Sequence, residues 1–235
     1  MTNDHVIVIT GSSRGIGRGL AEYFVADGHR VAGCSRNPVG FGLDGYSHAQ
    51  VDLSDEAQVR SWIRSIKNQF GRIDLLISNA GWMPKGSLMT MTPSSVAEAA
   101  LRNNWLSAYN VCREVAKVMM LQRQGRIVTI ASSMAAIHTE GNSAYAASKS
   151  ALIETTKILA KEMSQTGVTC NVIAPALVKT EAALALGEPV LRRVLETQTI
   201  KRDISIAEIA NVVKFFASAS SASITGQVIY MGVVV

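Results

Sequence analysis

Short runs of apolar and β-branched residues recur along the chain and are separated by longer stretches with helical patterns. Near-continuous apolar runs suit strands that are covered on both faces, so the alternation predicts βαβ units and a parallel sheet. The clearest runs cover residues 5–10, 30–35, 73–78, 126–131 and 168–173. Two weaker runs, at 47–51 and 227–231, extend the predicted sheet to seven strands.

Helices are predicted between these strands, over residues 15–26, 56–70, 94–121, 144–163 and 206–218. Ser54, Thr92 and Ser205 stand where a side-chain oxygen commonly caps a helix N-terminus. Two segments, 82–93 and 176–200, fit neither pattern and follow the carboxyl ends of strands. Ligands bind at that edge of an open α/β sheet, so both segments are candidate walls or lids of a substrate pocket, with ordinary surface connections as the alternative.

Composition favours one folded domain over residues 1–235, because 48% of the residues are hydrophobic, 17% are charged and no linker divides the chain. No apolar run is long enough to span a membrane, and no signal sequence precedes the first strand, so we expect a cytoplasmic protein. The net charge of +5 is scattered, which makes nucleic acid a poor partner and anionic small molecules a better one. The three cysteines, far apart, show neither metal-ligand spacing nor a disulfide framework, so no metal site is predicted.

Three glycines, Gly11, Gly15 and Gly17, follow the first predicted strand and open a helix. Glycine lets the backbone approach a pyrophosphate closely, and the helix N-terminus directs N–H groups at it. We therefore predict a dinucleotide site here, with a tight turn for helix packing as the plainer alternative.

Charge at the end of the second strand predicts the choice of dinucleotide. NAD sites place an acidic residue there to bind the ribose 2′-hydroxyl. This chain has Ser35 and Arg36 instead, with Arg14 in the glycine loop. Two guanidinium groups and no carboxylate suit a 2′-phosphate, so NADP(H) is predicted, unless both arginines are simply solvated.

A serine, a tyrosine and a lysine supply candidate chemistry for reducing a carbonyl. Tyr145 and Lys149 are one helical turn apart, and Ser132 follows the fifth strand, thirteen residues before Tyr145. Tyrosine has an ordinary pKa of about 10, so we expect the Lys149 ammonium to lower the pKa of Tyr145 for proton transfer. The Ser132 hydroxyl can stabilise the charge that develops on the carbonyl oxygen.

Together the motifs Thr10-Gly11-x-x-x-Gly15-Ile16-Gly17, Asn79-Ala80-Gly81 and Tyr145-x-x-x-Lys149 resemble those of the short-chain dehydrogenase/reductase family. The resemblance covers the whole chain. It implies a single-domain Rossmann fold, a doubly wound parallel sheet of about seven strands with order 3-2-1-4-5-6-7 and helices on both faces, assembled as a homotetramer or dimer.

The resemblance also implies site residues. Asn104 joins Ser132, Tyr145 and Lys149 as a support for a water relay to the lysine, with Asn103 leaving that register open. Lys149 also binds the nicotinamide ribose. The full set implied to contact NADP(H) is Gly11, Ser13, Arg14, Gly15, Ile16, Gly17, Ser35, Arg36, Asp52, Leu53, Asn79, Ala80, Gly81, Tyr145, Lys149, Pro175, Val178 and Thr180.

Within the family, the pattern is most similar to 3-oxoacyl-carrier-protein reductases, which implies NADPH-dependent reduction of a 3-oxoacyl thioester on carrier protein or CoA. Sugar, steroid and polyketide ketoreductases or alcohol dehydrogenases stay open, as does a non-catalytic nucleotide-binding regulatory protein. Apolar residues of the two irregular segments either line an adaptable pocket or form core beneath loops. They are Trp82, Met83, Leu88, Met89, Met91, Leu184 and Leu186.

Two departures from the family pattern stand out. Ala176 follows Pro175 where the family usually has glycine, next to the expected nicotinamide site. Near the C-terminus, Met231-Gly232-Val233 replaces the usual Asp-Gly-Gly. The first is expected to affect the movement of the following segment, and the second to affect packing between subunits.

Overall fold

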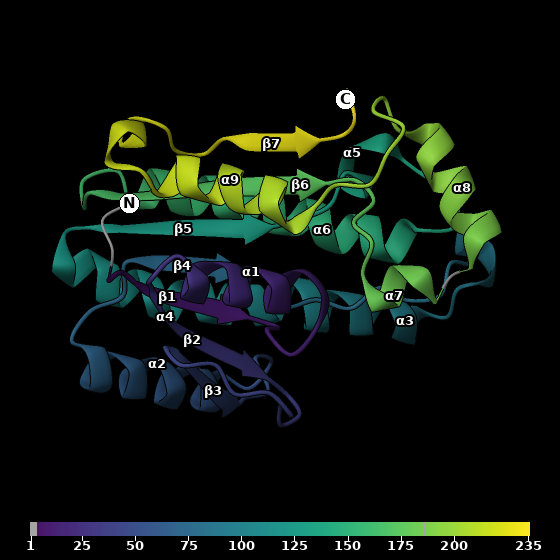
Figure 1. Ribbon diagram of the computed structural model, residues 1–235. Helices are drawn as coiled ribbons and strands as arrows, with labels where there is room; N and C mark the ends of the chain where they lie inside the picture. The colour runs from purple at the N-terminus through teal and green to yellow at the C-terminus, as the bar shows by residue number, and fades with distance from the viewer. Residues whose placement is uncertain (1–3, 186) are drawn as a thin grey trace.

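The computed structural model describes residues 4–185 and 187–235. In that part of the chain a parallel sheet of seven strands lies between two layers of helices (Figure 1). Its strand order is 3-2-1-4-5-6-7, which confirms the predicted doubly wound Rossmann sheet. The strands are β1 (Val6–Thr10), β2 (Arg30–Ser35), β3 (Tyr46–Gln50), β4 (Leu75–Ser78), β5 (Gly125–Ile130), β6 (Val168–Pro175) and β7 (Val228–Met231).

Helices cover both faces of the sheet because its central strands are apolar on both sides. On one face α1 and α9 pack against each other, and their buried Leu20, Phe24 and Phe216 join the sheet in one core (Figure 1). On the other face α2, α4 and α6 form the second core, with Trp62 and Met119. The longer helices are α1 (Gly15–Ala26), α2 (Glu56–Phe70), α4 (Ser107–Gln122), α6 (Ser143–Glu162) and α9 (Ile206–Ala217).

The predicted helix over 94–121 is interrupted. It consists of α3 (Ser94–Ala100), a π-helical turn η2 (Leu101–Leu106) and α4. In the π-turn the Ser107 N–H donates to the Arg102 carbonyl, five residues back. Such turns are frequent at functional sites, and this one contains Asn104.

Two of the three predicted helix caps are wrong. The α2 helix is capped by Asp55, whose carboxylate accepts from the N–H groups of Ala57 and Gln58, and Ser54 lies one residue earlier. The Thr92 hydroxyl donates to carbonyl groups of its own turn, and Pro93 occupies the N-cap of α3. Ser205 is confirmed, because it forms a capping box with Glu208 at the start of α9.

Both irregular segments lie beyond the carboxyl ends of the strands (Figure 1). The first contains a 3₁₀ turn, η1 (Met89–Met91), and the second contains α7 (Glu181–Leu184) and α8 (Glu188–Thr197). Short elements α5 (Met134–Ile137) and η3 (Ala219–Ser221) complete the described chain. Among its helices none has the length and apolar character that crossing a bilayer requires.

The segment after β7 closes over the second irregular segment. The Gly232 carbonyl accepts hydrogen bonds of 3.0 Å from the N–H groups of both Thr199 and Ile200. A side chain at Gly232 would lie 3.2 Å from the Ala176 Cβ and 3.2 Å from Ile204. The two departures from the family pattern therefore lie against each other, at the base of the 176–200 segment.

Candidate active site

The glycine loop lies against the turn that follows β4. A Cβ atom at Gly11 would be 2.8 Å from the Ala80 Cα, and one at Gly17 would be 2.3 Å from the Gly11 carbonyl oxygen. Gly11 and Gly15 also have φ values of 68° and 57°, which favour glycine. Glycine is therefore required at these positions for the close approach of the two turns.

The N-terminus of α1 is open to a ligand. Arg14, its N-cap residue, makes no side-chain hydrogen bond to the first turn, so that turn's N–H groups stay available for an anion. The Arg14 side chain is exposed, and Ser13 beside it is partly exposed. Thr180 lies on the opposite side of the loop, where its methyl group would be 3.3 Å from a Cβ at Gly15.

Asn79 and Thr10 bind the two turns together. The Thr10 hydroxyl accepts from the N–H groups of Asn79 and Ala80, each at 2.9 Å, and Asn79 Nδ2 donates to the Thr10 carbonyl at 2.9 Å. Sequence reasoning named Asn79 and placed Thr10 in the glycine motif, but it missed the role of the Thr10 side chain in joining the two turns.

The carboxyl end of β2 carries the residues expected beside the adenosine ribose. Ser35 ends this strand, and Arg36 is exposed next to it, with a single side-chain contact at 3.5 Å to Asn103 Oδ1. Hydrogen bonds from Ser54, together with the nearby Arg102 and Arg36, lower the pKa of Asp52. Three other residues expected to contact the cofactor are less accessible. Leu53 and Val178 are buried, and Ile16 is partly buried against the core that α1 and α9 form with the sheet.

Lys149 is buried at the carboxyl end of β5. Its ammonium Nζ donates to the Ile130 carbonyl at 2.9 Å and lies 5.9 Å from the centre of the Tyr145 ring. Burial lowers the pKa of Lys149 from 10.5 to about 8. The predicted helical pair is therefore close together, on the side of α6 that faces the sheet.

Tyr145 lies between Lys149 and Ser132. Burial raises the pKa of Tyr145, and a hydrogen bond with the Ser132 side chain partly offsets that increase. The expectation that the pKa of Tyr145 is lowered is therefore wrong for the protein without cofactor, because the desolvation of the phenolate outweighs the contact with Ser132. Ser132 is partly exposed, whereas the neighbouring Ser133 is buried and donates its N–H to the Pro175 carbonyl.

Asn104 is fully buried and fixes the first irregular segment to α6. Its Oδ1 accepts from the Trp82 N–H at 2.6 Å, and its Nδ2 donates to the Trp82 carbonyl at 2.9 Å and to Ser148 Oγ at 2.8 Å. Ser148 in turn donates to the Tyr145 carbonyl at 2.7 Å. Sequence reasoning missed Ser148, because a lone serine inside a helix carries no distinguishing pattern.

Gly81 connects the cofactor loop with the reacting groups. A Cβ atom at Gly81 would lie 3.2 Å from Asn104 Oδ1 and 3.4 Å from Lys149 Nζ. Its neighbour Ala80 is the residue in contact with Gly11. The structure thus brings the predicted glycine loop, Asn104 and Lys149 to one edge of the sheet, while Asn103 faces Arg36 instead.

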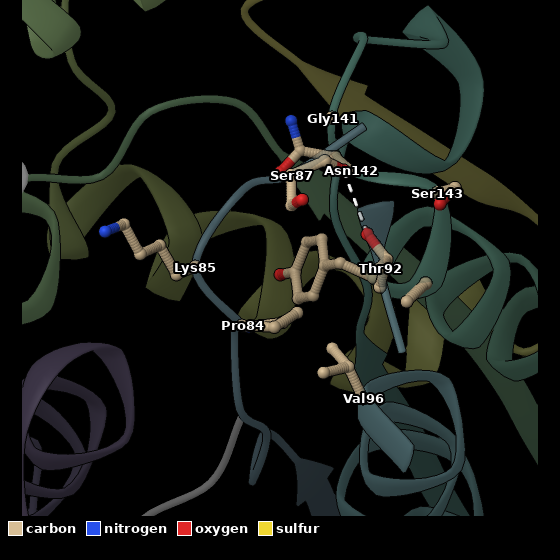
Figure 2. Close-up of a pocket in the computed structure, with 10 residues that line it drawn as sticks. Pro84, Lys85, Ser87, Thr92, Val96, Gly141, Asn142 and Ser143 are labelled. Carbon is tan, nitrogen blue, oxygen red and sulfur yellow. Dashed lines mark hydrogen bonds between the residues drawn. The ribbon is translucent and has the colours of Figure 1, made fainter. Parts of the chain in front are cut away.

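A shallow hollow with a volume of only about 10 Å³ opens beside Tyr145. Figure 2 shows residues 84–96 on one side of it and residues 141–143 on the other, with the Thr92 hydroxyl bonded to the Ser87 carbonyl. The two sides are tied by a 2.9 Å hydrogen bond from the Ser87 N–H to the Gly141 carbonyl. The predicted substrate segment 82–93 therefore does lie beside the tyrosine.

Apolar side chains of the two irregular segments are exposed rather than buried beneath loops. The interpretation of these residues as core is wrong, because Met89 is 78% exposed and Met91 is 73% exposed. Met83, Leu88 and Leu184 are exposed as well, Trp82 is partly buried, and Leu186 lies outside the described residues. Among the described residues, Met83, Leu88, Met89, Met91 and Leu184 form an exposed apolar rim beyond the carboxyl ends of the strands.

Similar proteins were found by sequence. A family model described as enoyl-(acyl carrier protein) reductase matches residues 11–232. The chain is 33% identical to 3-oxoacyl-(acyl-carrier-protein) reductase FabG of Escherichia coli K12, over 96% of this chain and 95% of that protein. It is also 33% identical to 3-oxoacyl-(acyl-carrier-protein) reductase MabA of Mycobacterium tuberculosis H37Rv, over 95% and 89% of the two chains.

Solved structures give the same picture. The ligand-free aldohexose dehydrogenase AldT of Thermoplasma acidophilum matches with a TM-score of 0.88 and 29% identity, over 97% of this chain and 92% of that one. ElxO with NADP bound matches with a TM-score of 0.89 and 27% identity, over 98% and 97%. Since the family model and the two reductases span nearly the whole sequence, this chain belongs to the short-chain dehydrogenase/reductase family of oxidoreductases.

Proposed function

We propose that this protein uses NADPH to reduce the ketone of a 3-oxoacyl thioester to an alcohol. The observation that carries the proposal is the meeting of Ser132, Tyr145 and Lys149 beside the Gly81 turn, whose other side contacts the glycine loop. A dinucleotide bound to that loop would thus reach the side chains proposed to transfer the proton.

The residues present fit such a cofactor. Gly11 and Gly17 let the glycine loop pack closely against the turn after β4, and the uncapped first turn of α1 supplies N–H donors for the pyrophosphate. Arg14 and Arg36 are exposed at the adenosine end and make no salt bridge within the described residues. Their charges suit a 2′-phosphate, and ElxO, of the same fold, is known with NADP bound.

In the proposed reaction the bound cofactor supplies a hydride to the carbonyl carbon. Tyr145 donates its phenolic proton to the carbonyl oxygen, and Ser132 donates a hydrogen bond to the same oxygen. Because burial raises the pKa of Tyr145, the phenol is protonated at neutral pH, as reduction requires. The Lys149 ammonium stabilises the phenolate that remains, and Asn104 supports the relay that returns the proton.

A thioester substrate is supported by both named relatives, which are reductases of 3-oxoacyl groups on acyl carrier protein. The exposed apolar rim, including Met83, Leu88 and Met89, suits an acyl chain, because methionine adapts to irregular apolar ligands. A free sugar is the second candidate, favoured by the similarity to aldohexose dehydrogenase.

The substrate class is tested by following NADPH oxidation, with NADH in parallel, against 3-oxoacyl thioesters, free ketones and aldoses. The proposal expects turnover with thioesters and NADPH. If only free ketones or sugars are turned over, the proposed thioester substrate is wrong and those compounds are the substrate class. Cofactor binding without turnover on any of them would support a regulatory nucleotide-binding protein instead.

A further inference from the structure

A chain of side-chain hydrogen bonds connects the glycine loop with the end of β2 by way of β3. Ser12 Oγ lies 2.8 Å from the Tyr46 hydroxyl, which lies 2.8 Å from His48 Nδ1. On the other side of the ring, His48 Nε2 lies 3.1 Å from Ser35 Oγ. Glycine at position 33 makes room for this chain, since a Cβ there would be 2.3 Å from both Ser12 Oγ and the Tyr46 oxygen.

Ser35 occupies the position at which a dinucleotide fold distinguishes the two cofactors. It ends β2, twenty residues after Gly15, and the preceding Cys34 carbonyl accepts from the N–H groups of Gly11 and Ser12. In folds of this type the side chain at that place contacts the ribose 2′-substituent. The hydrogen bonds that Ser35 makes therefore bear on cofactor choice.

The Asn37 carbonyl fixes the direction of those bonds, because a carbonyl can only accept. Ser35 Oγ donates to it at 2.6 Å, and His48 Nε2 lies within 3.3 Å of the same oxygen. Nε2 therefore carries a hydrogen. Burial lowers the pKa of His48, which favours the neutral ring, and Nδ1 then accepts from the Tyr46 hydroxyl.

We infer that His48 is a positioning residue for cofactor selectivity: its Nε2–H satisfies the Asn37 carbonyl when the Ser35 hydroxyl turns to donate to the ribose 2′-phosphate. The inference rests on the proposed use of NADPH. Without His48, turning the hydroxyl would leave the carbonyl of the exposed Asn37 to pair with water instead of with a fixed donor.

The binding of NADH does not need the His48 donor. A ribose 2′-hydroxyl can donate to Ser35 Oγ while Ser35 keeps its own hydrogen on the Asn37 carbonyl, so no substitute donor is needed. His48 therefore strengthens the binding of NADPH and leaves the binding of NADH unchanged.

Two substitutions at His48 distinguish the role of Nε2 from the role of Nδ1. In His48→Gln the side-chain amide reaches the place of Nε2 and keeps a donor toward Ser35 and Asn37. In His48→Asn the shorter amide keeps a partner for Tyr46 and loses that donor. Dissociation constants for NADPH and NADH, measured by calorimetry at one pH and ionic strength, give the selectivity of each variant without turnover.

We expect His48→Asn to weaken NADPH binding about threefold, the size of one hydrogen bond between neutral, solvent-accessible groups. NADH binding should stay within about twofold, which a general loss of structure would not allow, and His48→Gln should stay near the wild-type ratio. In a Ser35→Ala background, His48→Asn should have no further effect on NADPH.

Other outcomes contradict either the role of His48 or the proposed cofactor, and the two cases can be told apart. If the wild-type protein prefers NADPH and His48→Asn keeps the same ratio, or if His48→Gln loses as much as His48→Asn, the role of His48 is wrong and the proposed function stands. A wild-type protein that binds NADH as tightly as NADPH would instead contradict the proposed cofactor, and the inference with it.

Discussion

Lys149 is a buried cation that the fold must accommodate. It is only 4% exposed, and its pKa of about 8 shows that the interior disfavours its charge. Its one hydrogen bond, to the Ile130 carbonyl, compensates only part of the lost hydration. The sequence could predict that Lys149 and Tyr145 share a helix face, but their burial depends on distant strands.

Replacing this cation should stabilise the protein. The folded-state pKa lies below that of the unfolded chain, so the unfolded chain binds more protons between about pH 8 and 10.5 and stability rises with pH across that window. Below pH 8 the full cost of about 3 kcal/mol is present. Lys149→Met should therefore raise the free energy of unfolding at pH 7 by about 2–3 kcal/mol, measured in urea.

The advantage of Lys149→Met should shrink as the pH approaches 10. Lys157→Met is the matched control, because Lys157 is on the same helix but exposed, paired with Glu154 at 2.7 Å. It should change stability by less than about 1 kcal/mol, as exposed pairs contribute little. A Lys149→Met protein that is less stable than wild type at pH 7 would contradict this account of the site.

Single residues show where prediction from the sequence stops. The choice between Asn103 and Asn104 depended on a resemblance, whereas the structure separates them by burial: Asn104 faces Gly81 and Asn103 faces Arg36. Ser148 and Thr10 are tied to the site by bonds to Asn104 and to the Asn79-Ala80 turn, groups far away in sequence. Such contacts follow from the fold and leave no local pattern.

At the scale of elements, the π-turn between α3 and α4 is the feature that the sequence least revealed. One extra residue in a helix hardly alters the spacing of apolar positions, so the segment was predicted as one helix. The turn places Asn104 where it can bind both Trp82 and Ser148. The cap at Ser54 failed because the neighbouring Asp55 accepts from the N–H groups, and the cap at Thr92 failed because its hydroxyl donates to carbonyl groups of its own turn.

Asn104→Ala should therefore be costly. The substitution leaves the Trp82 N–H, the Trp82 carbonyl and Ser148 Oγ without their buried partner. We expect a loss of about 3 kcal/mol in the free energy of unfolding, together with a lower kcat. Thermal and urea unfolding measure the first effect, and NADPH oxidation measures the second.

Asn103→Ala is the control within the same turn. Asn103 is partly exposed and donates to the Ala99 carbonyl, so its loss should cost less than about 1 kcal/mol. Equal destabilisation by the two substitutions would mean that the π-turn as a whole, rather than the contacts of Asn104, stabilises this region.

At the scale of the whole molecule, the parallel sheet and its helical layers were predictable because strand runs are local signals, whereas the order of the strands came from the family resemblance. Surface exposure was harder to predict. The methionines of the irregular segments looked equally like core or pocket, and only the structure shows them at the rim.

The expected homo-oligomer has a candidate contact face between α4 and α6. An open groove of about 360 Å³ lies there, lined by apolar residues such as Tyr109, Met120 and Ile158 and by the charged Arg113, Lys117 and Glu162. Ile158 is 57% exposed and Met120 is 46% exposed, and exposed apolar side chains bordered by charged ones commonly mark an interface. We expect the protein to assemble through this face.

Ile158→Arg should then shift the protein toward smaller species in sedimentation velocity, because a charge buried in an apolar interface is unfavourable. Leu121→Arg is a suitable control, since Leu121 is 85% exposed and lies outside the groove. A wild-type monomer, or an assembly that Ile158→Arg leaves intact, would exclude this face.

The most direct test of the proposed reaction is NADPH oxidation with a 3-oxoacyl thioester by wild-type protein and by Tyr145→Phe. The substitution removes one hydroxyl and keeps the ring, so cofactor binding should remain within about twofold. Loss of the proton donor should lower kcat/KM at least about a hundredfold. If Tyr145→Phe instead turns over at nearly the wild-type rate, Tyr145 is not the acid and the account of this site is wrong.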